Sequence, residues 1–408
     1  MWFYLKLAWR NIFRNKRRTI IAGIAIGVGL ASMIFTDALI IGMRDNMIGS
    51  VTGSYLGEAQ IHRKDFRLTL EVEKTVNNLD EVVANLGKEE AVQHFTLRTS
   101  SFGMITSPAN FSSVLCVGIV PATEKHLSQI DDAIREGNFF EGENERDIII
   151  GSELAELLEV GLRDRVVITV SQAGTGDLSQ EMFRISGIYQ FNIKEMDSGF
   201  AFVRLSKSQE MLGIRNNVHE IAIKFKETKF ALQDKSPFWK KYSMNDNEAL
   251  SWTGIFPALK IVFGLVWVSI TFLGAILFGI IAFGIINTLF MSIYERWFEF
   301  AVIRAVGTRP SGVRKLVIFE AGSLAALSIA MGVFLGFIIT YIVTKTGIDY
   351  RGIEFAGATI TEMLYPVFHL RQFIIYPLAT FLFTLLIGLY PATVASRMLI
   401  ANALRKSL

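Results

Sequence analysis

The sequence predicts a membrane protein with four transmembrane α-helices, one before and three after a large mixed α/β extracytoplasmic domain. Three observations support this class. The 408 residues are 51% hydrophobic and only 19% charged, whereas a soluble domain has roughly 25% charged residues. Four apolar stretches are long enough to cross about 30 Å of hydrocarbon. Between the first two stretches, short alternating patterns are typical of strands mixed with helices.

The four expected spans are residues 20–42, 258–291, 316–344 and 372–395. The first could be a signal peptide, but a signal core has about 7–15 residues and a small-residue cleavage site. This stretch is longer and lacks that site, so we expect an anchor. The second would be about 50 Å long as a helix, so it either projects outward as a stalk or tilts. In the first span, Gly23 and Gly27 fit the small-xxx-small packing pattern, although such spacings also arise by chance.

Basic residues near the span ends predict the orientation, because they resist translocation. Segment 1–19 has six basic residues and no acid, loop 292–315 has five against two acids, and tail 396–408 has three. We expect these segments, including both termini, in the cytoplasm of a bacterial inner-membrane, multi-pass protein. Segment 43–257 has 23 basic and 31 acidic residues, a net charge of −8. We expect it outside, together with the short loop 345–371.

The first segment, 1–19, is expected to form an amphipathic basic helix. Trp2, Leu5 and Trp9 recur at helical spacing, and Lys6 and Arg10 begin a basic stripe. This pattern is typical of a helix lying in the membrane interface, with its cations toward anionic headgroups. Membrane lipids are therefore an expected partner. The same charges also fit a plain positive-inside signal.

The external segment 43–257 alternates strand and helix patterns. The expected strands are Ala91–Thr99, Phe111–Val120, Asp147–Ile150, Val166–Val170, Phe183–Tyr189, Phe200–Arg204 and Val218–Phe225. The expected helices, each opening with a Ser or Thr as N-cap, are Thr123–Ile134, Ser152–Leu158 and Ser206–Leu212. Segment Ser171–Glu181 is expected to be a hairpin tip. This tip is either a docking site for a partner or an ordinary loop. The candidate docking residues are Gly174, Thr175, Gly176, Asp177 and Leu178.

Catalytic, metal and nucleotide signals are weak. The five histidines are scattered with no HExxH pairing, so we expect no metal site. The single cysteine, Cys116, excludes an intramolecular disulfide. No GxxxxGK[ST] phosphate loop occurs, so this chain does not bind ATP by that mechanism. The net charge of +3 gives no reason to expect nucleic acid, and we expect a non-catalytic chain without its own cofactor.

The loop after the second span carries the most specific signal. Residues 295–306 have the pattern of a short amphipathic helix, Gly307 suits the left-handed C′ position, and Pro310 suits the first turn of the next helix. Such a helix either offers a knob to a cytoplasmic partner, with Glu299 and Arg304 available for charges at its edge, or merely lies on the membrane.

These residues resemble the MacB/FtsX-type permeases of ABC transporters, in layout most like the lipoprotein-releasing permeases of the LolC/LolE type. The loop is similar to the family's coupling-helix motif, with Glu320 following it. The resemblance assigns contact with an ATPase to Arg296, Glu299, Phe300, Ala301, Arg304, Ala305, Val306 and Gly307. The external segment resembles the MacB periplasmic core at Gly137, Phe139, Gly151, Leu154, Phe183, Gly187, Tyr189 and Asp197. The tail matches at Tyr390, Pro391, Ala392, Ala395 and Arg397.

The resemblance implies a permease subunit that transmits motion mechanically. Two copies of a separate ABC ATPase subunit would bind ATP and Mg, and a second permease chain, identical or homologous, would complete the complex. Lipoprotein release from the inner membrane is the leading expectation, with a periplasmic lipoprotein carrier or adaptor as a further partner. The alternatives are MacB-type efflux with an adaptor and outer-membrane duct, or FtsX-like signalling to cell-wall hydrolases.

A lipid-facing substrate cavity is expected near the outer halves of the first two spans. Apolar residues could contact acyl chains there, or could be plain packing. They are Phe35, Leu39, Met43, Phe256, Leu259 and Phe263. Asp37 is the one acid in the first span. It either contacts a substrate headgroup or the second permease, or is simply exposed at the interface.

Overall fold

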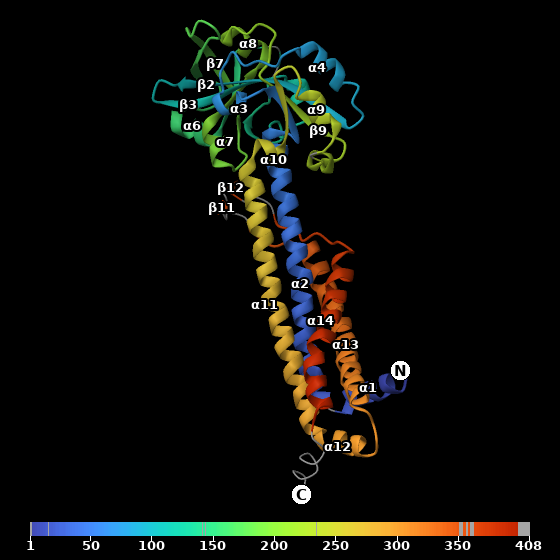
Figure 1. Cartoon of the computed structure of the whole chain (residues 1–408). Coiled ribbons are helices and arrows are strands. Elements are labelled where there is room, and N and C mark those ends of the chain that lie inside the picture. The colour runs from blue at the N-terminus through green and yellow to red at the C-terminus, as the bar shows by residue number, and fades with distance from the viewer. Residues whose placement is uncertain are drawn as a thin grey trace. The chain divides into compact units, whose positions relative to one another are not determined.

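The computed structural model describes residues 2–14, 16–140, 142, 144–233, 235–350, 354–355, 358–359 and 363–398. The chain forms two compact units (Figure 1). The helical unit comprises Met1–Asp45, Phe263–Asp349 and Met363–Leu408, and the sheet unit comprises Asn46–Val262 and Tyr350–Glu362. We describe each unit by itself.

The helical unit contains the apolar helices that the sequence predicted. Among the residues that the structure describes, four helices are long and apolar enough to cross a membrane. Two of them, α2 and α11, continue into residues of the sheet unit. The helices are α1 (Trp2–Arg14), α2 (Lys16–Val51), α11 (Pro257–Glu295), α12 (Trp297–Ala305), α13 (Pro310–Thr346) and α14 (Gln372–Ser396). With 39 residues, α11 is about 58 Å long. The passage of the four helices through a membrane, one before and three after the sheet unit, stays a prediction.

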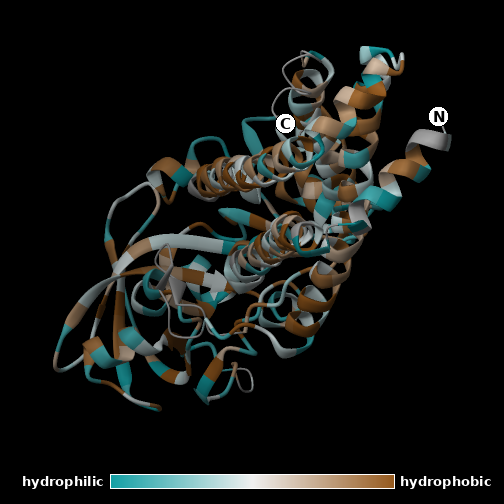
Figure 2. Cartoon of the chain, turned by 90° about the horizontal axis from the view of Figure 1, so that it is seen from below, coloured by the Kyte–Doolittle hydropathy of each residue, from teal (hydrophilic) through white to brown (hydrophobic). Residues whose placement is uncertain are grey.

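Small residues bring α2 and α13 together. A Cβ added at Gly27 would lie 2.8 Å from Met331 Cε and 3.2 Å from the carbonyl oxygen of Ser328, and one added at Gly332 would lie 2.7 Å from the carbonyl oxygen of Gly27. The expected small-xxx-small pair therefore packs within this chain, with Gly27 at the closest approach. Hydrophobic residues also cover outer faces of the long helices (Figure 2), as a hydrocarbon environment requires.

The sheet unit contains a mixed ten-stranded sheet, which confirms the expected α/β class. The strand order is β10-β1-β9-β2-β3-β8-β5-β7-β4, and β6 pairs with β2 and β7. The β3–β8 and β5–β7 pairs are parallel, and the others are antiparallel. The strands are β1 (Ala59–Arg63), β2 (Val92–Thr106), β3 (Phe111–Ile119), β4 (Ile134–Gly137), β5 (Asp147–Gly151), β6 (Arg165–Ser171), β7 (Leu178–Tyr189), β8 (Phe200–Arg204), β9 (Glu220–Phe225) and β10 (Asn247–Ser251).

Short helices connect these strands. A π-helix, Thr52–Leu56, continues from the end of α2, and a 3-10 helix spans Thr228–Leu232. A two-stranded ladder joins β11 (Glu354–Phe355) to β12 (Ala358–Thr359). The α-helices are α3 (Phe66–Thr69), α4 (Leu79–Leu86), α5 (Pro121–Glu124), α6 (Ser152–Leu158), α7 (Lys194–Gly199), α8 (Leu205–Leu212), α9 (Pro237–Tyr242) and α10 (Trp252–Ile255).

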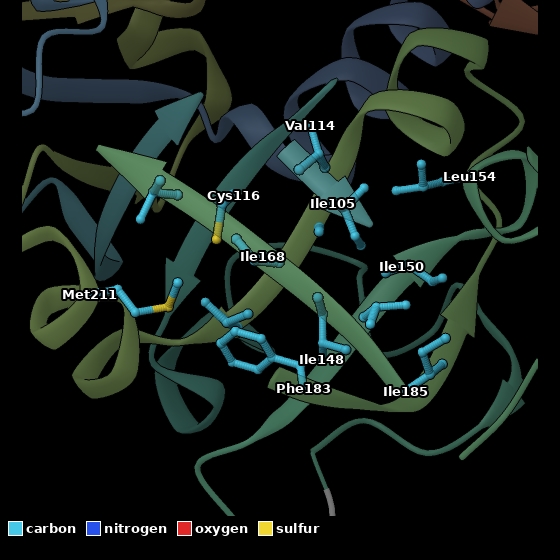
Figure 3. Close-up of a cluster of buried hydrophobic side chains, with 14 of the residues drawn as sticks. Ile105, Val114, Cys116, Ile148, Ile150, Leu154, Ile168, Phe183, Ile185 and Met211 are labelled. Atoms are coloured by element: carbon cyan, nitrogen blue, oxygen red, sulfur yellow. The ribbon is translucent and has the colours of Figure 1, made fainter. Parts of the chain in front are cut away.

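Alternation along the strands builds the main core of the sheet unit (Figure 3). Ile105 of β2 pairs with Ile168 of β6, and both are fully buried. Leu154 of α6 and Met211 of α8 join the same cluster. Because successive strand residues point to opposite faces, Met104 next to Ile105 is exposed. Each fully buried aliphatic side chain contributes roughly 1.5–3 kcal/mol.

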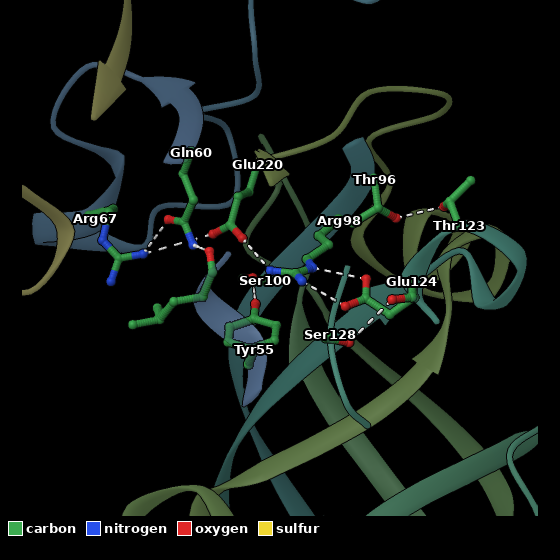
Figure 4. Close-up of polar contacts among 11 residues, drawn as sticks. Tyr55, Gln60, Arg67, Thr96, Arg98, Ser100, Thr123, Glu124, Ser128 and Glu220 are labelled. Atoms are coloured by element: carbon green, nitrogen blue, oxygen red, sulfur yellow. Dashed lines mark hydrogen bonds and ion pairs between the residues drawn. The ribbon is translucent and has the colours of Figure 1, made fainter. Parts of the chain in front are cut away.

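The sheet unit also contains a buried ionic network (Figure 4). The Arg98 guanidinium on β2 donates to both carboxylate oxygens of Glu124, at 2.6 and 3.0 Å, and to Glu220 at 2.9 Å. Its Cζ lies 4.2 Å from the ring centroid of Tyr55, in the π-helix. Burial alone would lower the pKa of Arg98, but Glu124, Tyr55 and Glu220 raise it above its usual value. The guanidinium therefore stays charged and joins the π-helix to β2.

The expected helix Thr123–Ile134 is wrong. Only Pro121–Glu124 is helical, and β4 begins at Ile134. Tertiary contacts explain the difference, because the Glu124 carboxylate binds buried Arg98 and the Gln129 N–H donates to the carbonyl oxygen of Gly53.

The expected Ser and Thr N-caps are also wrong. Gly151 and Arg204 occupy the N-cap positions of α6 and α8, without side-chain caps. The hydroxyls serve tertiary contacts instead: Thr123 bonds to Thr96, and Ser206 donates to Glu145.

Candidate functional site

The short helix α12 is formed by local breaks at both of its ends. Arg296, with φ −112° and ψ 19°, separates it from α11. At its end, Thr308 N–H donates to Ile303 O at 3.2 Å and Gly307 N–H donates to Arg304 O at 3.1 Å. Gly307 has φ +107°, so the chain adopts a Schellman-type stop that disfavours a side chain. The predicted C′ position of Gly307 is confirmed.

The next helix starts as abruptly as α12 stops. Pro310 occupies the first turn of α13, as predicted, where its missing N–H costs no hydrogen bond. One face of α12 packs on the start of this helix and on the end of α14. Phe300 and Ala301 are fully buried there, in a cluster with Val317 of α13 and Ala395 of α14. The position of α12 in the helical unit is therefore set by packing.

A chain of four alternating charges ties α12 to its neighbours. Arg14 of α1 donates to Glu299 Oε1 at 2.7 Å, and Arg296 Nε donates to Glu299 Oε2 at 2.8 Å. Arg296 also donates through Nη1 to Glu320 of α13. Its guanidinium carbon lies 4.9 Å from the ring centroid of Phe300. The chain thus connects α1, α12 and α13.

The charge state of Glu299 follows from these contacts. Burial on its own raises the pKa of the carboxyl, but the hydrogen bonds from Arg296 and Arg14 outweigh it and lower the pKa below its usual value. The carboxylate is therefore ionised at neutral pH, and its two oxygens each face a different arginine.

Arg304 fixes the far end of α12. Its Nη1 donates to the carbonyl oxygens of Ser396, at 3.2 Å, and Met398, at 2.8 Å. These carbonyls lie at the end of α14, where the backbone has no helical donors left. Glu299 and Arg304 are thus bonded within the chain. Whether they also contribute charges at the edge of a partner contact stays a prediction.

The other face of α12 is exposed and apolar. Its residues recur at helical spacing and are Phe298, Val302, Ile303 and Val306. Val306 is 83% exposed, and we call these four residues the α12 outer face. Of these four residues, only Val306 is among the predicted coupling residues. The clue to the other three is their spacing opposite buried Phe300 and Ala301.

The predicted coupling residues divide into two groups. Five of them face inward and position the helix: Arg296, Glu299, Phe300, Ala301 and Arg304. The other three are exposed at its end: Ala305, Val306 and Gly307. Their role toward an ATPase stays a prediction.

The residues predicted for a substrate cavity are only partly described. Phe35, Leu39 and Met43 lie half-buried on α2 in the helical unit, and Phe256 is exposed in the sheet unit. The side chains of Leu259 and Phe263 lie outside the described residues. The cavity therefore stays a prediction.

Asp37 has a partner inside the chain. The Tyr376 hydroxyl on α14 lies close enough to interact with its carboxylate. The acid therefore joins α2 to α14, and contact with a headgroup or a second permease stays a prediction.

The predicted hairpin tip lies between β6 and β7. Strand pairing reaches Ser171 and Leu178, so the turn is shorter than the expected Ser171–Glu181. Gly174 and Gly176 both have positive φ, and Gly174 N–H donates to Glu73 at 2.9 Å. Thr175 and Asp177 in this turn, and Leu178 after it, are exposed. Docking of a partner there stays a prediction.

Comparisons with known proteins identify the family. The model described as MacB-like periplasmic core domain matches residues 19–231, which is more than half of the chain. The model described as FtsX-like permease C-terminal matches residues 252–400. The two matches follow the order of the sheet unit and the later apolar helices.

Individual relatives are distant. The lipoprotein-releasing system transmembrane protein LolC of Xylella fastidiosa is 23% identical over 310 residues, covering 71% of this chain and 72% of that protein. The corresponding LolE of Haemophilus influenzae is 19% identical over 354 residues, covering 81% and 82%. The periplasmic region of MacB from Actinobacillus actinomycetemcomitans covers 50% of this chain and 92% of that structure, with 13% identity and a TM-score of 0.34. The family assignment rests on the two matched models.

Proposed function

Because this chain belongs to the ABC transporter permeases that have a MacB-like periplasmic core domain and an FtsX-like C-terminal domain, we propose that it transmits ATP-driven motion. A separate ATPase subunit hydrolyses ATP with Mg, and this chain couples that hydrolysis to substrate movement outside the membrane. The complex contains two ATPase copies and a second permease chain, identical or homologous. Both termini and α12 lie on the cytoplasmic side of a bacterial inner membrane.

The observation that carries the proposal is the division of α12 into two faces. The inner face is fixed by Phe300, Ala301 and the charge chain through Glu299. The α12 outer face is apolar and exposed, as a docking helix requires. A helix rigidly held on one side and apolar on the other can pass a push from a partner to α13 and α14.

We propose that the complex releases lipoproteins from the membrane. The support is that two relatives covering most of this chain are described as lipoprotein-releasing proteins. Handover to a periplasmic lipoprotein carrier, or to an adaptor, would then take place at the sheet unit. The hairpin turn between β6 and β7 is our candidate for this contact.

The experiment for the coupling role changes the α12 outer face without touching its support. Val306→Asp adds a charge at an 83% exposed position, so the chain should still fold and insert. We expect the tagged variant to lose most of the co-purifying ATPase subunit, because a desolvated charge in an apolar contact is costly. Ser311→Asp is the matched control, since it adds the same charge at an exposed position on α13. Equal ATPase recovery with both variants would refute the coupling role of this face.

A second pair of variants tests the support. Glu299→Lys places three cations together, and Gly307→Val forces a branched residue to φ +107°. We expect both to abolish ATPase association or stimulation while the chain stays in the membrane. Normal ATP turnover by the reconstituted variant complexes would count decisively against the assignment.

The cargo needs a separate assay. Lipoprotein release from proteoliposomes that contain the complex and ATP should depend on this chain. Intact ATPase coupling without any release would retain the permease and overturn lipoprotein as its cargo.

A further inference from the structure

A groove lies between α1, α13 and α14 within the helical unit. It has a volume of about 780 Å³, within the roughly 300–1,000 Å³ typical of ligand pockets. Phe319 and Gly322 of α13 and Phe381 and Leu385 of α14 line it. The lining is almost entirely apolar, so its occupant must be apolar over most of its length.

One side of the groove is a single face of α1. Trp2, Leu5, Lys6, Trp9 and Arg10 all line it, and these positions follow the i, i+3, i+4, i+7, i+8 spacing of one helical face. The tryptophans and the cations therefore share a face, whereas the opposite side of α1 buries Ala8. Tryptophan and lysine or arginine together are the side chains that prefer the boundary between acyl chains and headgroups.

The charged side chains that line the groove are basic. Lys6 and Arg10 are exposed, and no acidic residue lines the groove in the described part of the chain. By contrast Arg14, one turn further along α1, is already paired with Glu299. By helical spacing, Lys315 lies on the same face of α13 as Phe319, one turn earlier. An occupant with a negative headgroup would meet these cations.

One polar atom inside the groove is unpartnered. Ser323 lines the groove and is 5% exposed, and its hydroxyl has no hydrogen-bond partner among the described residues. A serine in an apolar helix usually bonds to a carbonyl of the preceding turn, as Ser328 does with Leu324. The free hydroxyl is therefore available to an acceptor such as an ester carbonyl in the occupant.

We propose that this groove binds one anionic glycerophospholipid of the bilayer, with an acyl chain between α13 and α14 and the phosphate at Lys6 and Arg10. The apolar lining, the one-signed charge and the free Ser323 hydroxyl all match that molecule. The lipid fills the space under α1 and so holds this helix against α13. The site is separate from the α12 outer face and does not depend on the coupling proposal.

The test measures lipid retained by the purified full-length chain. The chain in mild detergent is incubated with phosphatidylglycerol or phosphatidylcholine, and the bound lipid is counted by native mass spectrometry. We expect preferential retention of phosphatidylglycerol. Lys6→Gln with Arg10→Gln should weaken its binding by about 10- to 30-fold, from the attraction of two basic residues for an anionic lipid. Lys16→Gln with Arg17→Gln removes equal charge outside the groove lining and should change binding little.

A second pair of variants tests the acyl site. Ala326→Phe fills the groove from an exposed position on α13, and Ala330→Phe adds the same ring one turn away, outside the lining. We expect only the first to reduce lipid retention, with unchanged melting of both variants. Equal retention of the two lipids, or equal binding by the Lys6/Arg10 and Lys16/Arg17 variants, would overturn the proposal. Unchanged binding in Ala326→Phe would overturn it as well.

Discussion

Replacing Arg98 by methionine tests whether the buried ionic network holds the sheet unit together. Arg98 and Glu124 are both 0% exposed, and Glu220 is 2% exposed. The substitution keeps the length of the side chain but leaves two carboxylates without their shared cation. Among the described residues, the ion-pair partner that Glu220 retains is Arg67, at 3.8 Å. The change therefore creates buried charge without creating a large cavity.

The structure sets the size of the effect. Removing one partner of a buried ion pair costs roughly 3–5 kcal/mol, because the remaining charge stays desolvated. In a folding unit of about 200 residues, 1 kcal/mol corresponds to roughly 2–4 °C in melting temperature. We therefore expect Arg98→Met to lower the melting temperature of the sheet unit by about 6–20 °C.

A double-mutant cycle separates charge from packing. Glu124→Leu alone leaves Arg98 with Glu220, and Arg98→Met with Glu124→Leu removes the closest pair altogether. The double variant should be more stable than the sum of the single effects predicts, since a buried pair replaced by apolar groups is often tolerated. The assay is thermal unfolding of the full-length chain in detergent.

Arg67→Met serves as the control. Arg67 is partly exposed, so its loss should cost less than about 1 kcal/mol. The reasoning is refuted if the two single effects simply add, or if Arg98→Met melts within 2 °C of the unaltered chain. Either result would mean that the two carboxylates are solvated or neutral after the arginine is removed.

Three further outcomes are expected. An impermeant maleimide should label Leu178→Cys but not Val306→Cys in intact spheroplasts. The native Cys116 should not react, because it is buried and burial raises the pKa of its thiol to about 12. Labelling of Val306→Cys but not Leu178→Cys would contradict the predicted orientation in the membrane. Burial lowers the pKa of His219 in the folded chain. As the pH falls below the ordinary histidine pKa, the unfolded chain therefore takes up a proton that the folded chain does not, and the free energy of unfolding decreases. Melting at pH 7.5 and 5.5 should differ less in His219→Gln than in the unaltered chain. Replacing the turn from Gly174 to Asp177 by Asn-Gly should spare ATPase assembly and impair handover to a carrier, and unchanged release would reassign it to a plain loop.

Local rules predicted the parts of this fold that depend on few residues. The end of α12 at Gly307 and the start of α13 at Pro310 follow from backbone geometry alone. The strands around Ile105 and Ile168 follow from alternation. The four apolar helices follow from length and hydropathy. In each of these cases, the residues that determine the structure lie within the same turn, strand or helix.

Long-range contacts decided the parts that the sequence left open or predicted wrongly. The stretch after Glu124 has helical spacing, but the Glu124 carboxylate binds Arg98 of β2 in the interior of the sheet unit. Residue spacing likewise places Glu299 on an amphipathic helix, but it does not show which face of that helix packs against the rest of the chain. Its partner Arg14 lies 285 positions away in the chain, and Arg304 meets carbonyls more than 90 positions away. The choice between a supporting and a docking role therefore required the structure.

The links of the charge chain at α12 differ in strength, and the difference bears on how a push would travel. The Arg14–Glu299 pair has side chains that are 67% and 37% exposed, so water and salt screen it and it adds little stability. The Arg296–Glu320 pair is only 11% and 7% exposed, and a pair in such surroundings is costly to break. We therefore expect a force on α12 to reach α13 mainly through the Arg296–Glu320 pair, because the Arg14–Glu299 pair opens more readily. The firm link couples α12 to a long apolar helix, and the weak one adds little to the packing that holds α1 in the helical unit.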